Sequence, residues 1–370
     1  MREYPIGWKT VKLDVVAEFF NGKPLEGQVI PDGNSSLITL DSINIKGQLK
    51  KNHKKISADG DFLKAGDIVS VLSDIAHGYL LGLSAVIPAD DHYVLNQRMG
   101  LLRTRSEIDP NYLRSFINFN QSYFRERGQG TSQRHIYKRD FYDFDFSYPP
   151  LTEQKAIAKA LSDIDELIAV TAQLLKKKER VFEGALRTEF SKSSGATLTT
   201  VSEICEVTKG SAGKYDKDFV QGSFGFLNGG INFSGSTEFA NDSGDTVVIS
   251  EGGNSCGFVN YIPKAFWCGG HAYRLIGFKG KQKYLYYALK KSEVEIMNLR
   301  VGSGLPNVQK KDLSNFMTPI HQSSKKQEEV LKFLDSLTSE IDYLKAELVK
   351  HECIKQGMAH DLLTGKVRLA

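Results

Sequence analysis

The chain has 370 residues, of which 41% are hydrophobic, and it carries a formal net charge of +4. A chain of this length can bury more than one core, so two domains are the natural expectation. The mild excess of positive charge permits a nucleic-acid partner but does not require one.

The four cysteines form no C-x-x-C pair, and no group of His and Cys has the spacing of zinc ligands. We therefore expect reduced thiols and no bound metal. No apolar run approaches the roughly 20 residues that span a bilayer, and the charged N-terminus does not resemble a signal peptide. The sequence predicts a cytoplasmic protein without a membrane association.

Residues 1–149 have the pattern of a mixed α/β domain. Short apolar runs, such as 68–72 and 83–88, are separated by Gly, Asn and Asp, which is typical of strands and turns. Residues 112–119 are expected to form a short helix. The pattern changes at Pro149-Pro150, where we place the end of this domain.

The segment 150–192 is predicted to be one long helix. After Pro150 there is no further Pro, and no Gly before Gly184. Apolar residues recur at steps of four and three, the heptad spacing of a helix that packs along a narrow seam. Thr152 is the expected N-cap. The seam residues are Ile157, Leu161, Ile164, Ile168 and Leu175.

The same order is then repeated. Residues 193–320 return to the α/β pattern with more Gly, and 321–370 are predicted to form a second long helix from about Ser323. Its seam residues are Val330, Leu334, Leu337, Ile341, Leu344 and Leu348.

The two helices agree position by position when the first is moved along the chain. A shift of 173 places (330 minus 157) puts Ile157 on Val330, and it also puts Gln154 on Gln327. The globular parts repeat more loosely. Gly22 corresponds to Gly210, and Gly128-Gln129-Gly130 resembles Gly302-Ser303-Gly304. The sequence therefore predicts one scaffold that carries two different binding surfaces.

The narrow seams must be buried, and the simplest solution packs one helix against the other. Because the chain passes through a domain between them, an antiparallel pair is expected. The predicted fold class is α+β, with two similar mixed α/β domains separated by two long helices packed as an antiparallel coiled coil, related by a pseudo-twofold axis. Lys178 and His351 fall on seam positions, where they either fix the register or mark frayed stretches.

Several motifs resemble those of one family. The sequence 149–154 (PPLTEQ), followed by the heptad helix, resembles the start of the central helix in specificity subunits of type I restriction–modification systems. The C-terminal sequence 362–369 (LLTGKVRL) is similar to the ending of the same family, and 7–13 and 128–140 are similar to segments of its target recognition domains. The stretch 319–327, before the second helix, departs from the usual pattern.

The resemblance implies a sequence-specific DNA-binding subunit. Its two target recognition domains, 1–149 and 193–320, would each read one half of a bipartite, asymmetric target in double-stranded DNA. The spacer helices would set the gap and bind two methyltransferase subunits, which carry S-adenosylmethionine and methylate adenine. A restriction/translocase subunit would join them. This chain itself would have no active site and bind no cofactor.

The residues agree with a binding protein. The sequence contains no Asn/Asp-Pro-Pro-Phe/Tyr motif of an adenine methyltransferase and no P-loop. His77 with Asp67 and Asp74, and His271 near Cys268, are interpreted as structural rather than catalytic. Two alternatives to the main hypothesis stay open. One is a coiled-coil scaffold that joins two protein-binding domains, and the other is a solitary or decoy specificity protein.

DNA contacts require donors on loops: Lys and Arg for phosphates, and Arg, Lys, Asn, Gln and Ser for bases. The run Lys50 to Lys55 is either a phosphate-binding segment or a solvated hairpin, and Arg134 is the favoured base reader. The candidates are Lys51, Lys54, Arg127, Gln129, Ser132, Gln133, Arg134 and His135 in the first domain, and Lys209, Lys214, Tyr215, Arg300, Ser303, Asn307 and Lys310 in the second.

Overall fold

The computed structural model describes residues 4–58, 60, 62–75, 77–90, 92–220, 222–302 and 304–369. By its contacts the chain forms two compact units: Met1–Val170 with Leu348–Ala370, and Thr171–Glu347. We call these the first and the second unit. Each combines a globular part with stretches of both long helices, so this division cuts across the segment boundaries drawn from the sequence.

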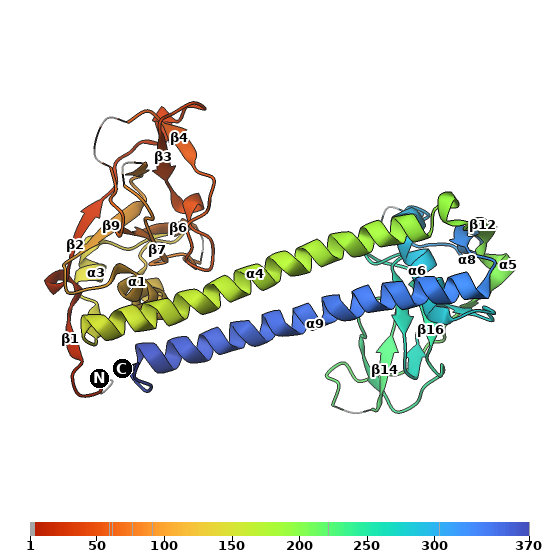
Figure 1. Cartoon of the computed structure of the whole chain (residues 1–370). Helices are drawn as coiled ribbons and strands as arrows, with labels where there is room; N and C mark the ends of the chain where they lie inside the picture. The colour runs from red at the N-terminus through yellow and green to blue at the C-terminus, as the bar shows by residue number, and fades with distance from the viewer. Residues whose placement is uncertain are drawn as a thin grey trace. The chain divides into compact units, whose positions relative to one another are not determined.

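The first unit is built on an antiparallel sheet of four strands in the order β2-β9-β5-β7. A three-stranded sheet, β4-β3-β8, and two strand pairs, β1-β11 and β10-β6, complete it (Figure 1). The strands are β1 (Lys9–Lys12), β2 (Ala17–Asn21), β3 (Ser35–Ile38), β4 (Lys54–Ile56), β5 (Ile68–Val71), β6 (Ser73–Ile75), β7 (Ser84–Val86), β8 (Tyr93–Leu95), β9 (Met99–Thr104), β10 (Gln133–His135) and β11 (Asp145–Tyr148).

Three short helices accompany these strands: α1 (Pro110–Phe119), α2 (Gln121–Arg127) and α3 (Lys138–Tyr142). The helix expected at 112–119 is α1. It begins two residues earlier because the Asp109 side chain accepts hydrogen bonds from the backbone N–H groups of Asn111 and Tyr112, with Pro110 in the first turn.

The second unit repeats the same strand arrangement. Its sheets are β13-β19-β16-β17, β15-β14-β18 and the pair β12-β20, and β14-β18 is parallel, as β3-β8 is in the first unit. The elements are β12 (Thr197–Thr200), α5 (Val201–Ile204), β13 (Glu206–Lys209), β14 (Phe224–Leu227), β15 (Gly235–Thr237), β16 (Thr246–Ser250), β17 (Val259–Ile262), β18 (Phe266–Cys268), β19 (Ala272–Ile276), α6 (Gln282–Lys291), α7 (Glu293–Met297), α8 (Lys310–Ser314) and β20 (Met317–Ile320).

The repeated glycine after the first strand of each large sheet has a steric cause. A β-carbon at Gly22 would lie 2.0 Å from the carbonyl oxygen of Asn96, and one at Gly210 would lie 2.2 Å from that of Gly269. Only glycine allows the backbone to approach so closely. The match between these two glycines therefore reflects one packing constraint met twice.

The two long helices are α4 (Leu151–Glu189) and α9 (Ser324–Leu363). The first turn of α4 starts where the carbonyl of Pro150 accepts a hydrogen bond from the Gln154 N–H, at 3.0 Å. The predicted N-cap, Thr152, is therefore wrong: it lies exposed inside the first turn, because the helical bonding already begins at Pro150. Among the helices of the described residues, none contains an apolar stretch of the length that crossing a bilayer requires.

The helices pack antiparallel, as each unit shows separately (Figure 1). In the first unit, Ile157 and Leu161 near the start of α4 share a core with Leu362 near the end of α9. In the second unit, Leu186 near the end of α4 shares a core with Val330 near the start of α9. The seam residues expected from the sequence are buried, except Leu175 and Leu348, which are half-buried.

Ion pairs cross between the helices. Lys178 pairs with Glu340 in the second unit, and Lys355 pairs with Asp165 in the first, at 2.5 Å. The Lys178 contact favours a role in fixing the register over a frayed seam. His351 is half-buried.

Each unit has a further ion pair at the place where one long helix begins and the other ends. The residue at the helix start is acidic in the first unit and basic in the second. In the first unit, the carboxylate of Glu153 accepts two hydrogen bonds of 2.7 Å from Arg368. In the second unit, Lys326, which corresponds to Glu153, pairs with Glu189 at 3.1 Å. We call these two pairs the helix-start ion pairs.

Candidate nucleic-acid interface

The two ends of each four-stranded sheet have different surroundings. In the first unit, β9 leads directly to Asp109, whose N–H donates to the side chain of Gln154 at the start of α4. The corresponding end of the second sheet, at Ile276, borders a hollow that Gln327 of α9 also lines. We call this the helix end of each sheet and the opposite one the loop end. Binding residues are common on loops held by such a scaffold.

The loop 128–136 lies at the loop end of the first unit. Gln129 and His135 exchange backbone hydrogen bonds of 2.9 and 2.8 Å, and Gly130 between them has a φ of 112°. Strand β10 then pairs with β6, with His135 opposite Ser73. The ring nitrogen Nδ1 of His135 lies 2.5 Å from the Ser73 hydroxyl.

The second unit has the same loop, but the sequence match was two residues out of register. Val301 and Asn307 exchange backbone hydrogen bonds as Gln129 and His135 do. The left-handed glycine is Gly302, with a φ of 95°. Gly130 therefore corresponds to Gly302, because the backbone pairing, not the spacing of the glycines, sets the alignment.

The side chain of Arg134 makes a contact within its own loop that could not be predicted from the sequence. Its Nε and Nη2 both donate to the carbonyl of Gly128, at 3.2 and 2.7 Å. The guanidinium thus ties the two sides of the loop together, and its Nη1 lies 3.5 Å from the carbonyl oxygen of His77. A base-reading role for Arg134 stays a prediction.

We expect Arg134→Ala to loosen this loop. The backbone amides of Gln129 and His135 should exchange hydrogen faster, because the guanidinium no longer bridges the loop. Hydrogen exchange followed by mass spectrometry measures the effect. Arg127→Ala is the matched control, since its guanidinium lies 3.5 Å over the Tyr123 ring instead. Equal protection in both variants would contradict the role of Arg134 as a brace.

The candidates in the first unit lie in two places, the loop with β10 and the region of β4. Arg127, Gln129 and Ser132 are exposed on or beside the loop, and Gln133, Arg134 and His135 are half-buried on β10. Lys54 is exposed on β4, which pairs with β3 in a different sheet, and Lys51 is exposed three residues before that strand. The end of the run Lys50 to Lys55 thus forms a strand with exposed lysines. This fits both a phosphate-binding segment and a solvated hairpin.

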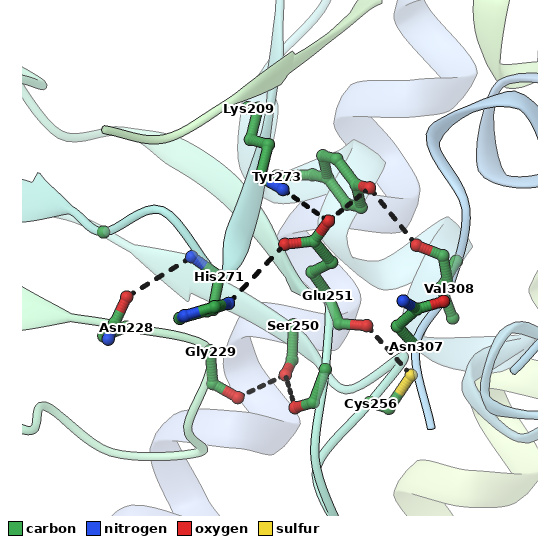
Figure 2. A network of polar contacts seen from close by, with 12 residues as sticks. Lys209, Asn228, Gly229, Ser250, Glu251, Cys256, His271, Tyr273, Asn307 and Val308 are labelled. Atoms are coloured by element: carbon green, nitrogen blue, oxygen red, sulfur yellow. Dashed lines mark hydrogen bonds and ion pairs between the residues drawn. The ribbon is translucent and has the colours of Figure 1, made fainter. Parts of the chain in front are cut away.

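A polar network occupies the loop end of the second unit (Figure 2). Glu251, directly after β16, has a side chain that is 14% exposed. Its Oε1 lies 2.6 Å from Nζ of Lys209 and 3.0 Å from the Tyr273 hydroxyl, and its Oε2 lies 3.9 Å from Nδ1 of His271. We call Lys209, Glu251, His271 and Tyr273 the Glu251 network.

The first unit has an apolar residue at the corresponding position. Glu251 donates its N–H to the carbonyl of His271 and accepts from the N–H of Val308. Leu72 makes the same two backbone bonds with Arg98 and Ile136, and it is 7% exposed. The sheet register also places Gly100 at the position that Tyr273 has in the second unit, because Gly100 pairs with Ser70 and Tyr273 pairs with Ile249. One scaffold position therefore holds a buried leucine in one unit and a charged network in the other.

The candidates of the second unit are only partly brought together. Lys209 belongs to the network, and Asn307 pairs with Gly252 beside it. Arg300 and Lys214 are exposed, and Tyr215 is half-buried, stacked on Phe226 at 4.4 Å. Lys310 begins α8 and lines the hollow at the helix end of the sheet. Ser303 lies outside the described residues.

Sequence reasoning missed Glu251 and Tyr273 and interpreted His271 only as structural. In the sequence, Glu251 opens the glycine-rich stretch Glu251-Gly252-Gly253-Asn254, which is typical of a turn and does not indicate the network. Among the described residues, no three His, Cys, Asp or Glu side chains are grouped so that they could hold a metal ion.

Comparisons with known proteins agree with this architecture. The type I restriction modification DNA specificity domain matches twice, over residues 5–180 and 195–350. A putative type I specificity subunit of Mycoplasma pneumoniae is 29% identical over 175 residues, 46% of either chain, so the chain matches about half the length of this relative. The specificity subunit of the type I restriction enzyme MjaVIII of Methanocaldococcus jannaschii is 24% identical over 324 residues, 75% of either chain.

Solved structures show the same fold. The crystal structure of the type I restriction–modification S subunit from M. genitalium matches with a TM-score of 0.71 at 19% identity, over 96% of both chains. A structure described under complex assembly and conformational transition of the type I R-M system matches with a TM-score of 0.60 at 17% identity, over 99% of this chain and 100% of that one. The chain belongs to the family of type I restriction–modification specificity subunits and contains two of its DNA specificity domains.

Proposed function

We propose that the chain is the non-catalytic DNA-reading subunit of a type I restriction–modification complex. Each unit reads one half of a bipartite, asymmetric target in double-stranded DNA through the loop end of its sheet. The observation that carries the proposal is the repeated scaffold with different side chains at the same position, Leu72 in one unit and Glu251 in the other. Two domains with the same scaffold but different side chains at the binding surface are suited to two different half-sites.

The side chains at both loop ends have the required chemistry. Gln129 and Ser132 in the first unit, and Lys209 and Arg300 in the second, are exposed donors on or beside loops. Lys and Arg neutralise phosphates, and the same side chains read base edges when a loop reaches the major groove. These residues are the contacts we expect, with Lys51, Lys54 and Lys214 as phosphate contacts.

The partners are part of the proposal. In each unit α4 keeps apolar side chains exposed outside the seam: Leu167 (44%) and Val170 (53%) in the first, Leu174 (41%) and Val181 (44%) in the second. Such residues on a charged helix suit protein partners. We assign them to two methyltransferase subunits, which carry S-adenosylmethionine and methylate adenine. A restriction/translocase subunit joins this complex, which acts in the cytoplasm on chromosomal DNA.

Mapping of methylated adenines in the host chromosome tests the proposal. We expect one bipartite motif with a fixed gap, and we expect it to vanish when this chain is deleted and to return when the chain is restored. Methylation that is unchanged by the deletion would contradict the proposal and favour a scaffold or a decoy protein.

A further inference from the structure

The backbone of Glu251 is held by three hydrogen bonds, two to the backbone of distant residues and one to the thiol of Cys256 in the same turn. Its N–H donates to the carbonyl of His271 at 2.9 Å, and its carbonyl accepts from the N–H of Val308 at 2.8 Å. The thiol of Cys256 donates to the same carbonyl at 3.1 Å. These bonds fix the backbone of Glu251, and the contacts of its carboxylate with Lys209 and Tyr273 orient the side chain, which is what a precise binding site requires.

The carboxylate in turn orders its neighbours. Tyr273 is 3% exposed, and its burial, together with the bond to Glu251, raises its pKa to about 12, so the hydroxyl keeps its proton and donates. Lys209 contacts the same carboxylate oxygen as Tyr273, and His271 lies near the other one; the side chains of Lys209 and His271 are 52% and 71% exposed. Tyr273 is therefore the buried partner of the carboxylate, and Lys209 and His271 are its exposed neighbours.

An exposed lysine usually samples many rotamers, and a contact that orders it costs conformational entropy. Here the 2.6 Å bond to Glu251 already restricts Lys209. A restrained donor can discriminate between bases, whereas an unrestrained one mainly adds affinity for phosphate. Guanine offers two acceptors, N7 and O6, on its major-groove edge, and lysine is a suitable donor to both.

We propose that Glu251 is a specificity-determining positioning residue, which holds Lys209 as a donor that reads one guanine in the half-site of the second unit, with the exposed ring of His271 beside it. This inference rests on the proposed function, and it adds which residue sets the specificity and which base is read. Leu72 cannot play this part in the first unit, because its side chain neither accepts nor donates a hydrogen bond.

The test uses host strains whose only copy of this chain carries Glu251→Gln or Lys209→Met. The first change keeps the shape of the side chain and removes its charge; the second removes the donor. We expect both to reduce the preference for guanine roughly tenfold at one and the same position of one half-site. The other half-site and the gap should stay as in the wild type. Sequencing of methylated adenines gives this readout for thousands of sites at once.

Glu206→Gln is the matched control. Glu206 is an exposed acid on the same strand as Lys209, at the helix end of the sheet, and its replacement should leave the motif intact. An unchanged motif in the Glu251→Gln or Lys209→Met strain overturns the inference. So does a loss of preference in both half-sites, which would indicate a general effect on affinity.

The test still gives a result if one of the variants fails to fold. If Glu251→Gln abolishes all methylation, Lys209→Met decides, because its largely exposed side chain is not needed for the core. One degenerate position in that strain supports the inference, and an intact motif overturns it. A wild-type strain without a motif that depends on this chain would instead overturn the proposed function itself.

Discussion

Alanine at position 161 is expected to lower the free energy of unfolding of the first unit by about 2–5 kcal/mol. Leu161 is 4% exposed and belongs to the core that also contains Ile157, Leu362 and Leu363. Removing its side chain leaves a cavity at the contact between the start of α4 and the end of α9. Urea unfolding of the full chain, followed by circular dichroism, measures the loss.

The same helix supplies the control. Leu167 lies on α4, less than two turns further along, but it is 44% exposed. Leu167→Ala removes the same atoms without opening a cavity, so we expect a change within about 0.5 kcal/mol. If the two substitutions had equal effects, the assignment of the seam would be wrong.

Leucine in place of Gln154 is expected to destabilise the first unit by about 3 kcal/mol. Gln154 is fully buried, and its amide donates to the carbonyls of Glu107 and Pro149, at 3.1 and 2.9 Å, and accepts from the Asp109 N–H at 2.9 Å. Leucine fits a similar volume but leaves these three backbone groups without their partner. Thermal unfolding by calorimetry gives the comparison.

Gln327→Leu is the corresponding change in the second unit. Gln327 is half-buried, and its amide donates to the carbonyl of His321 at 2.7 Å. With one such bond and access to water, we expect a loss of about 1 kcal/mol. A larger effect at Gln327 than at Gln154 would show that the two helix starts are held by some other contact.

The long helices could be predicted because their signal is local. A heptad spacing of apolar residues shows in any stretch of the sequence which side chains share a face, and Ile157, Leu161, Val330 and Leu334 are buried accordingly. The start of α4 was harder to place. Threonine is a common N-cap, but the carbonyl of Pro150 already makes the first helical bond, so Thr152 falls inside the helix.

The Glu251 network could not be predicted because its members come from three separate parts of the chain. Lys209, Glu251 and Tyr273 meet only through the register of β13, β19 and β16, and no spacing in the sequence encodes that register. The loop glycines show the same limit. Spacing aligned Gly128 with Gly302, whereas the backbone bonds align Gly130 with it. Side-chain contacts across a sheet become visible only after the strands are paired.

The reversed charges of the helix-start ion pairs have a consequence during synthesis. The first helix leaves the ribosome before the second exists, with its apolar seam uncovered and with neighbouring nascent chains close by. If two copies of α4 paired, each Glu153 would occupy the place of Lys326 and would face Glu189 of the other copy, carboxylate against carboxylate. The reversed charges therefore disfavour pairing of α4 with a second copy of itself and favour its pairing with α9.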